Sequence, residues 1–387
     1  MQNSDRGYIT GIDGLRAVAA LLVMLFHYYV FAGSPKFTGS FIANAGSIGV
    51  DIFFTISGFV LFLPFASLYQ RREPILIKDY FSRRFRRILP LYYFNLFIIV
   101  TLFTPAFIMQ WDKLKLVLIS LVFGQNFVLD KSIRTINGVT WTLGLEMLFY
   151  ILLPFIYKLF VGKRWIYGLT GALLISYIYK ASALYLFNPG WDDSYYIQFW
   201  VSRQLPGVIQ QFALGMAAAS LWINYRDKNI FSNKYLFSML GLLGFGMLVL
   251  GMWFFIKYGS AKYWFGSGVY GYIPLLNFNT FLSLAAAMVL LSLCNKGTIT
   301  SKALSWKPLG FLGTISYGIY LWHNPIGKVF NNAIGLHQDK LFLLLLIAGT
   351  TTIAISTLSY CFIEKPFIKR QIYQFNKVKT VNKATNY

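Results

Sequence analysis

An arginine and a histidine stand eleven residues apart in an otherwise apolar segment, GLRAVAALLVMLFHYY, residues 14–29. Such a position is energetically unfavourable for Arg16, because placing an arginine near the middle of a membrane-spanning helix costs roughly 3 kcal/mol or more of free energy. Eleven residues complete about three helical turns, so Arg16 and His27 lie on one helix face, roughly 16 Å apart along the axis. Asp13 shares that face and can pair with Arg16. The segment therefore predicts a cation at one end of a helix face and a possible general base at the other.

The composition of the whole chain indicates a membrane protein. Of its 387 residues 57% are hydrophobic and 19% aromatic, and only 12% are charged, about half the share in a soluble domain. Apolar runs of membrane-spanning length recur along the chain, which excludes a soluble protein with a large core. We expect an all-α polytopic membrane protein, a bundle of about ten transmembrane helices. The predicted limits are 11–31, 47–69, 88–109, 141–160, 165–187, 206–224, 235–256, 273–294, 309–332 and 341–363, with a shorter buried or interfacial helix at 114–124.

The positions of the basic residues predict how the chain is oriented in the membrane and do not indicate a nucleic-acid-binding site. The net charge is +22, but the Lys and Arg residues cluster between apolar segments instead of on one soluble face. Their bias toward the loop at 70–90 and the C-terminal end predicts that both termini are cytoplasmic, and that the loop contacts anionic lipid head groups. We expect no nucleic-acid partner. The predicted organisation is one transmembrane domain, residues 1–370, followed by a basic cytoplasmic tail, residues 371–387.

Metal and disulfide sites are not expected. The two cysteines, Cys294 and Cys361, both fall in apolar segments, and the chain has only three histidines. Neither number nor spacing fits a disulfide framework or a multi-ligand metal site.

Three further ionisable residues fall in predicted spans at about the depth of His27. With the orientation above, Asp51 lies about one turn into the second span, and Glu146 about two turns into the fourth. His323 lies in the outer half of the ninth, just before Pro325. Ionisable residues inside a membrane usually face the bundle interior or a cavity and mark function. We therefore expect these residues and His27 to meet in one layer and form a site.

The basic loop after the second span contains four arginines, Arg83, Arg84, Arg86 and Arg87, on a predicted amphipathic helix leading into the third span. Topology alone would be satisfied by lysine. Guanidinium groups clamp phosphates bidentately, so this choice favours binding of a phosphorylated substrate as well.

Five segments together resemble the membrane-bound acyltransferase-3 family, whose bacterial members O-acylate surface glycans and other exported molecules. They are GIDGLRAVAALLVMLFH, GSIGVDIFFTISGFVLF, FSRRFRRILPLYY, WTLGLEMLFYILLP and LGTISYGIYLWHNP, in family order from residue 11 to about residue 366. The resemblance implies ten transmembrane helices in the bacterial plasma (inner) membrane. It also implies a cytoplasmic acyl-CoA, usually acetyl-CoA, as donor and co-substrate, with Arg16 and His27 as the essential pair.

The family resemblance also indicates which acceptor to expect. Some members carry a C-terminal hydrolase-like domain that passes the acyl group on. Here about twenty residues follow the EKPF segment, so we expect transfer to be completed within the membrane domain. The expected acceptor is a hydroxyl of an exported or surface glycan or of a lipid-linked sugar.

We therefore predict a membrane O-acetyltransferase. His27 is the general base or the acyl acceptor, and either Asp51 or Glu146 is its carboxylate partner. Arg16 and the loop arginines hold the phosphates of the donor. The residues predicted to contact the substrates are Trp141, Tyr150, Tyr320, Trp322 and His323.

The alternative from another class is a non-catalytic glycan or lipid transporter or flippase, since polar residues in mid-membrane fit that function too. Transporters often contain inverted repeats with paired broken helices. The sequence shows no such pairing, which favours the enzyme.

Overall fold

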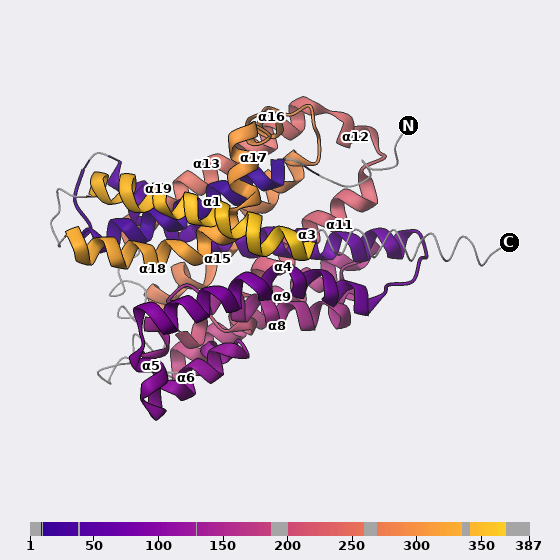
Figure 1. Ribbon diagram of the computed structural model, residues 1–387. Helices are drawn as coiled ribbons and strands as arrows, with labels where there is room; N and C mark the ends of the chain where they lie inside the picture. Colours follow the sequence, from indigo (N-terminus) through magenta and orange to yellow (C-terminus); the bar gives the residue numbers. More distant parts are fainter. Residues whose placement is uncertain are drawn as a thin grey trace.

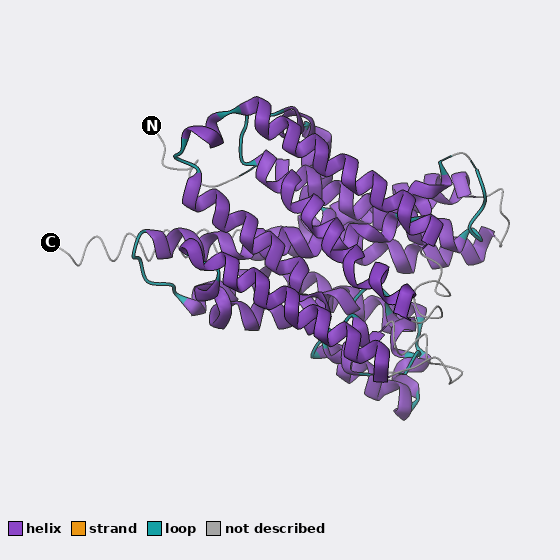
Figure 2. Ribbon diagram, turned by 180° about the vertical axis from the view of Figure 1, so that it is seen from behind, coloured by secondary structure: helices purple, strands orange, loops and turns teal. Residues whose placement is uncertain are grey.

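The computed structural model describes residue 9 and residues 11–37, 39–128, 130–186, 200–258, 269–334 and 341–368. This part of the chain is helical and contains no strand, and its long helices lie side by side in a bundle (Figure 1; Figure 2). Within these described ranges, seven segments are long and apolar enough to cross a membrane. The protein is therefore an all-α, multi-pass membrane protein.

Ten long helices make up most of the part of the chain that the structure describes. They are α1 (Gly11–Phe31), α3 (Gly49–Gln70), α4 (Ile77–Ile98), α8 (Trp141–Ile156), α9 (Trp165–Leu186), α11 (Leu205–Tyr225), α13 (Lys234–Tyr258), α15 (Val269–Leu293), α18 (Ser316–Ile334) and α19 (Leu341–Ser359).

Shorter elements connect the long helices. The short α-helices are α2 (Ser40–Asn44), α5 (Ala106–Met109), α6 (Trp111–Leu121), α7 (Ile133–Ile136), α12 (Asn229–Ser232), α16 (Ile299–Leu304) and α17 (Lys307–Thr314). Single 3₁₀ turns occupy Gly46–Ile48, Gly124–Phe127, Tyr157–Leu159 and Gly162–Arg164, and π-helical turns extend α4 and α19 over Ile99–Phe103 and Tyr360–Glu364.

Each predicted span overlaps one of the long helices, but the limits differ in two places. The arginine-rich segment is continuous with the third span, because α4 begins at Ile77. The predicted ninth span, 309–332, is divided at Ile315 into α17 and α18. Pro325 lies inside α18 and does not end it.

The span count and the tail stay predictions. Seven segments satisfy length and hydropathy, while α9, α15 and α18 coincide with predicted spans without being among the seven. The tail at 371–387 lies outside the described residues.

The helix α1 occupies a central place, packing against α3, α17, α18 and α19. The most extensive helix pair is α3 with α11, and it depends on two facing glycines. A Cβ at Gly58 would lie 2.0 Å from the Phe212 carbonyl oxygen, and a Cβ at Gly215 would lie 2.0 Å from the Thr55 carbonyl oxygen. Small residues let membrane helices approach closely and pack well. This contact fixes where α3 and α11 present their polar side chains.

Gly215→Ala should destabilise the protein, because the added methyl would force the α3 and α11 backbones apart. We expect a loss of about 1–3 kcal/mol, the usual range for overpacking, measured as a lower melting temperature of the purified protein in detergent. Gly246→Ala is the matched control, since a Cβ there would meet nothing within 4 Å. Equal melting temperatures for the two variants would contradict this account of the contact.

Candidate active site

Two histidines from distant parts of the chain meet inside the bundle. His27 on α1 and His323 on α18 bring their ring centroids within 4.9 Å, and His27 Nδ1 lies 3.2 Å from His323 Nε2. His323 is fully buried and His27 is half-buried. The packing of α1 against α18 therefore creates a hydrogen-bonded histidine pair.

The neighbouring carbonyls decide which nitrogens carry protons. His323 Nδ1 lies 3.0 Å from the Ile319 carbonyl oxygen, so it carries the hydrogen and leaves Nε2 as an acceptor. His27 Nδ1 faces that acceptor and the Val23 carbonyl oxygen at 2.9 Å. Because both partners accept, the hydrogen of neutral His27 is on Nδ1. His27 Nε2 therefore keeps a free lone pair, which is the form that a general base needs.

Neither predicted carboxylate is hydrogen-bonded to His27. Asp51 Oδ1 instead accepts hydrogen bonds from Gln211 Nε2 at 2.9 Å and from Asn279 Nδ2 at 2.6 Å. The expected carboxylate partner of His27 is replaced in the structure by His323.

Glu146 is engaged elsewhere. Its Oε1 accepts hydrogen bonds from Ser57 Oγ at 2.9 Å and Tyr150 OH at 2.8 Å. Asp51 belongs to the first turn of α3, whereas Glu146 lies in the second turn of α8. The two carboxylates line different cavities.

A cavity of about 310 Å³ contains His27 and Asp51 in its wall; we call it the outer cavity and the one that contains Arg16 the inner cavity, after the predicted orientation. The wall of the outer cavity contains both aromatic and polar side chains. Other lining residues are Trp141, Trp200, Arg203, Gln211, Asn279 and Tyr320.

An inner cavity of about 100 Å³ contains Arg16 in its wall. Its other polar lining residues are Ser57, Arg84, Arg87, Thr142, Glu146, Tyr150, Ser316, Tyr317 and Tyr320. The expected single layer of ionisable residues is therefore wrong for Glu146, which lies with the arginines rather than with His27.

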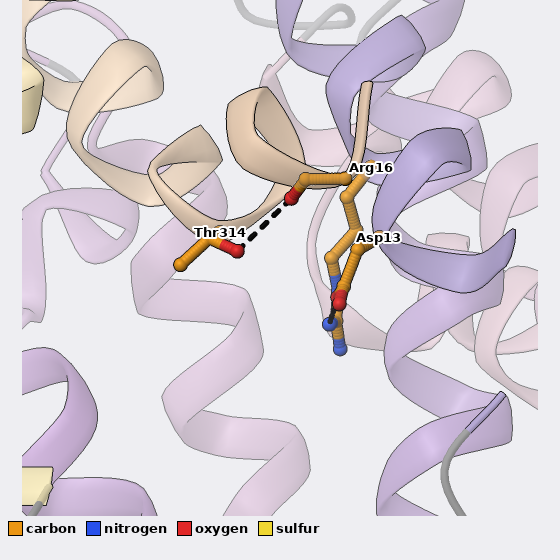
Figure 3. A network of polar contacts seen from close by, with 4 residues as sticks. Asp13, Arg16 and Thr314 are labelled. Carbon is orange, nitrogen blue, oxygen red and sulfur yellow. Dashed lines mark hydrogen bonds and ion pairs between the residues drawn. The ribbon is translucent and has the colours of Figure 1, made fainter. Parts of the chain in front are cut away.

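The predicted pairing of Arg16 with Asp13 is confirmed. Arg16 donates to Asp13 Oδ1 at 2.8 Å, next to the Thr314 side chain of α17 (Figure 3). Of the four loop arginines only Arg84 and Arg87 line the inner cavity. The Nε of Arg84 is buried and has no hydrogen-bond partner, so the cavity offers an unused donor that suits an anionic ligand.

A thin layer separates the two cavities. Val50, Phe54 and Tyr320 line both of them. The Tyr320 hydroxyl lies 2.7 Å from Thr142 Oγ1 and donates to the Val139 carbonyl oxygen at 3.2 Å. Val50, Phe54 and Tyr320 therefore belong to the wall between the arginine end and the histidine end.

Three of the five predicted substrate contacts line a cavity and two do not. Trp141 lines the outer cavity, Tyr150 the inner one and Tyr320 both. Trp322 lines neither, because it is buried and donates to Ser359 Oγ at 2.9 Å. His323 contacts His27 instead of a cavity.

Sequence reasoning missed a buried cation. Lys180 on α9 is 2% exposed and its Nζ lies 3.4 Å from Asn279 Oδ1. It is the only Lys, Arg, His, Asp or Glu between 165 and 186, so the rule that marked Asp51 and Glu146 would have found it. The described residues contain no group of three metal-ligating side chains that could hold a metal ion.

Comparison with known proteins assigns the family. A model described as an acyltransferase domain, that of the acyltransferase-3 family, matches residues 9–361. The putative peptidoglycan O-acetyltransferase YrhL of Bacillus subtilis is 29% identical over 96% of this chain. The O-acetyltransferase OatA of Staphylococcus aureus is 26% identical over 95%, and the peptidoglycan O-acetyltransferase OatA of Listeria monocytogenes 25% over 96%.

The chain spans only 56% of the Bacillus relative and 58% of the other two. No solved structure matches it. Since the family model covers nearly the whole chain, helices and both cavities included, the protein belongs to the acyltransferase-3 family of multi-pass membrane proteins.

Proposed function

We propose that this protein is an O-acetyltransferase of the bacterial plasma membrane. It moves an acetyl group from cytoplasmic acetyl-CoA to a hydroxyl of an exported glycan, such as peptidoglycan, or of a lipid-linked sugar. Family membership and the activities for which the relatives are named support the reaction class. The observation that carries the mechanism is the histidine pair, because it leaves His27 Nε2 unprotonated at the wall of the outer cavity.

The inner cavity suits the phosphates of the donor. Arg16, Arg84 and Arg87 bring three guanidinium groups to its wall, and guanidinium recognises phosphate with paired hydrogen bonds. The buried Nε of Arg84 gains a partner when a phosphate binds. The uncharged arm of the donor then extends toward Tyr320, Phe54 and Val50, the apolar layer shared with the outer cavity.

His27 performs the proton transfer. As the acceptor hydroxyl attacks the thioester carbonyl, its proton passes to His27 Nε2. The new C–O bond forms, the C–S bond breaks, and the imidazolium returns the proton to the departing thiolate, so the ring ends as it began. The same lone pair could alternatively attack the thioester and carry the acetyl group covalently before passing it on.

His323 acts as a positioning residue for His27. Its Nε2 accepts the Nδ1 hydrogen of His27, which fixes the ring orientation and the tautomer. The Val23 carbonyl oxygen supports the same hydrogen. When His27 becomes positively charged, both neutral acceptors stabilise the charge by hydrogen bonding.

His27→Ala should lower acetyl transfer by about 10²–10⁴-fold, the usual contribution of a general acid–base group. The assay follows radiolabelled acetyl groups from acetyl-CoA into glycan in membranes that contain the variant. Equal amounts of variant and wild-type protein in the membrane are the control. A wild-type rate in His27→Ala would contradict the mechanism.

His323→Leu removes the acceptor for His27 Nδ1, whereas His323→Gln can retain one through its Oε1. We expect His323→Leu to lower kcat about a hundredfold, within the acid–base range, with the KM for acetyl-CoA unchanged. His323→Gln should recover part of that loss. Equal rates for both variants would show that His323 serves packing and not the orientation of His27.

Arg84→Gln should raise the KM for acetyl-CoA by roughly 10–100-fold, because a charge-assisted hydrogen bond contributes about 1.5–3 kcal/mol. Arg83→Gln on the same helix is the matched control, since Arg83 does not line the inner cavity. Equal effects of the two variants would mean that the arginines act through topology or lipid contact and not through the donor site.

A further inference from the structure

A polar network forms one wall of the outer cavity and is not used by the transfer step. Asp51 from α3, Gln211 from α11 and Asn279 from α15 all line that cavity. They converge on Asp51 Oδ1, which accepts from both amide groups. Asp51 and Gln211 are 7% and 2% exposed. Three helices thus hold one carboxylate in a fixed orientation.

Behind this wall, Lys180 supplies a buried positive charge. Its Nζ lies 3.4 Å from Asn279 Oδ1, the opposite end of the amide that donates to Asp51. The Gln210 side-chain amide is oriented so that its NH₂ group faces acceptors and its oxygen faces donors. In this orientation the Gln210 oxygen also accepts a hydrogen bond from Lys180 Nζ at 2.9 Å. Lys180 therefore fixes the direction in which Asn279 presents its NH₂ group.

The network leaves two hydrogen-bond acceptors unused. Gln211 Oε1 is buried and has no partner. In the part of the chain that the structure describes, Asp51 makes its side-chain hydrogen bonds through Oδ1 alone, so Oδ2 remains available. An unpaired buried acceptor such as Gln211 Oε1 destabilises the protein. Asp51 and Gln211 both line the cavity, so a ligand that brings two donors could pair with both oxygens.

Aromatic rings form another part of the same cavity. Trp141 and Trp200 meet edge to face with centroids 5.5 Å apart, and both line the cavity. The Arg203 guanidinium lies 5.9 Å from the Trp141 ring. A site with flat apolar surfaces and a few fixed polar atoms is typical of small-molecule recognition. A sugar ring matches it, because the C–H face packs on an aromatic ring while the hydroxyl groups donate at the edge.

We propose that the outer cavity is a binding subsite for one sugar residue of the acceptor. Asp51 Oδ2 and Gln211 Oε1 accept hydrogen bonds from two of its donors, hydroxyl groups or an acetamido N–H, while Trp141 packs on the ring. Asn279 and Lys180 are positioning residues for Asp51. The proposal rests on the proposed function in one respect, namely that the bound sugar is the acetyl acceptor. In that case a further hydroxyl group of the sugar is directed at His27 in the same cavity.

Equilibrium binding without acetyl-CoA tests the subsite separately from catalysis. The probes are the N-acetylglucosamine–N-acetylmuramic acid disaccharide and maltotriose, titrated calorimetrically into purified protein in nanodiscs. We expect at least one sugar to bind wild type, and Gln211→Met and Asp51→Asn each to weaken it about tenfold, the value of one ordinary hydrogen bond. Lys180→Met should also weaken binding, and Lys180→Arg should restore part of it.

Gln125→Met is the matched control. Gln125 is likewise buried and its Oε1 has no partner, but it does not line the outer cavity. The Gln125→Met variant should therefore bind the sugar with wild-type affinity. Failure of both sugars to bind wild type, or equal affinity in wild type and Gln211→Met, would overturn the subsite. Sugar binding that depends on Gln211 in a protein that transfers no acetyl group would instead contradict the proposed function and leave the subsite standing.

Discussion

A polar group placed inside a bilayer must find its hydrogen-bond partner within the protein, and the organisation of this molecule depends on one such partnership. The contact of His27 with His323 joins α1 to α18 deep in the bundle. It uses the Nδ1 hydrogen of His27, which leaves Nε2 for chemistry. Because the buried partner is a neutral ring and not a carboxylate, the pair needs no counter-ion in the membrane interior, where an unpaired charge is costly.

The same constraint places the charged side chains around the two cavities in two separate sets. Arg16 pairs with Asp13 and shares the inner cavity with Glu146 and two arginines of α4. The carboxylate of Asp51 faces the outer cavity and is held by amides, with Lys180 behind them. The apolar layer around Tyr320 stands between the sets. A molecule built this way can hold an anionic donor on one side and a hydroxylated acceptor on the other.

Much of this arrangement could be predicted from the sequence. Hydropathy located the helices, and the 100° turn per residue placed Arg16 and His27 on one face of α1. The partners of each side chain could not be predicted in this way. They depend on how each helix is rotated about its axis, which is set by close backbone contacts such as those of Gly58 with Phe212 and of Gly215 with Thr55. For that reason the predicted depth in the membrane, taken alone, placed Glu146 with His27. Gln211 could not be recognised in the sequence, because an uncharged amide does not stand out as an ionisable residue does.

The most direct test of the account is the sidedness of the reaction. Proteoliposomes would enclose radiolabelled acetyl-CoA, with a glycan acceptor added only outside, and labelled acceptor would be collected from the external medium. Wild-type protein is expected to yield acetylated acceptor outside the vesicles, and His27→Ala is expected to yield none. Acetylation that occurs only when acetyl-CoA and acceptor are supplied on the same side would contradict the proposal that the acetyl group passes from cytoplasmic acetyl-CoA to an exported acceptor.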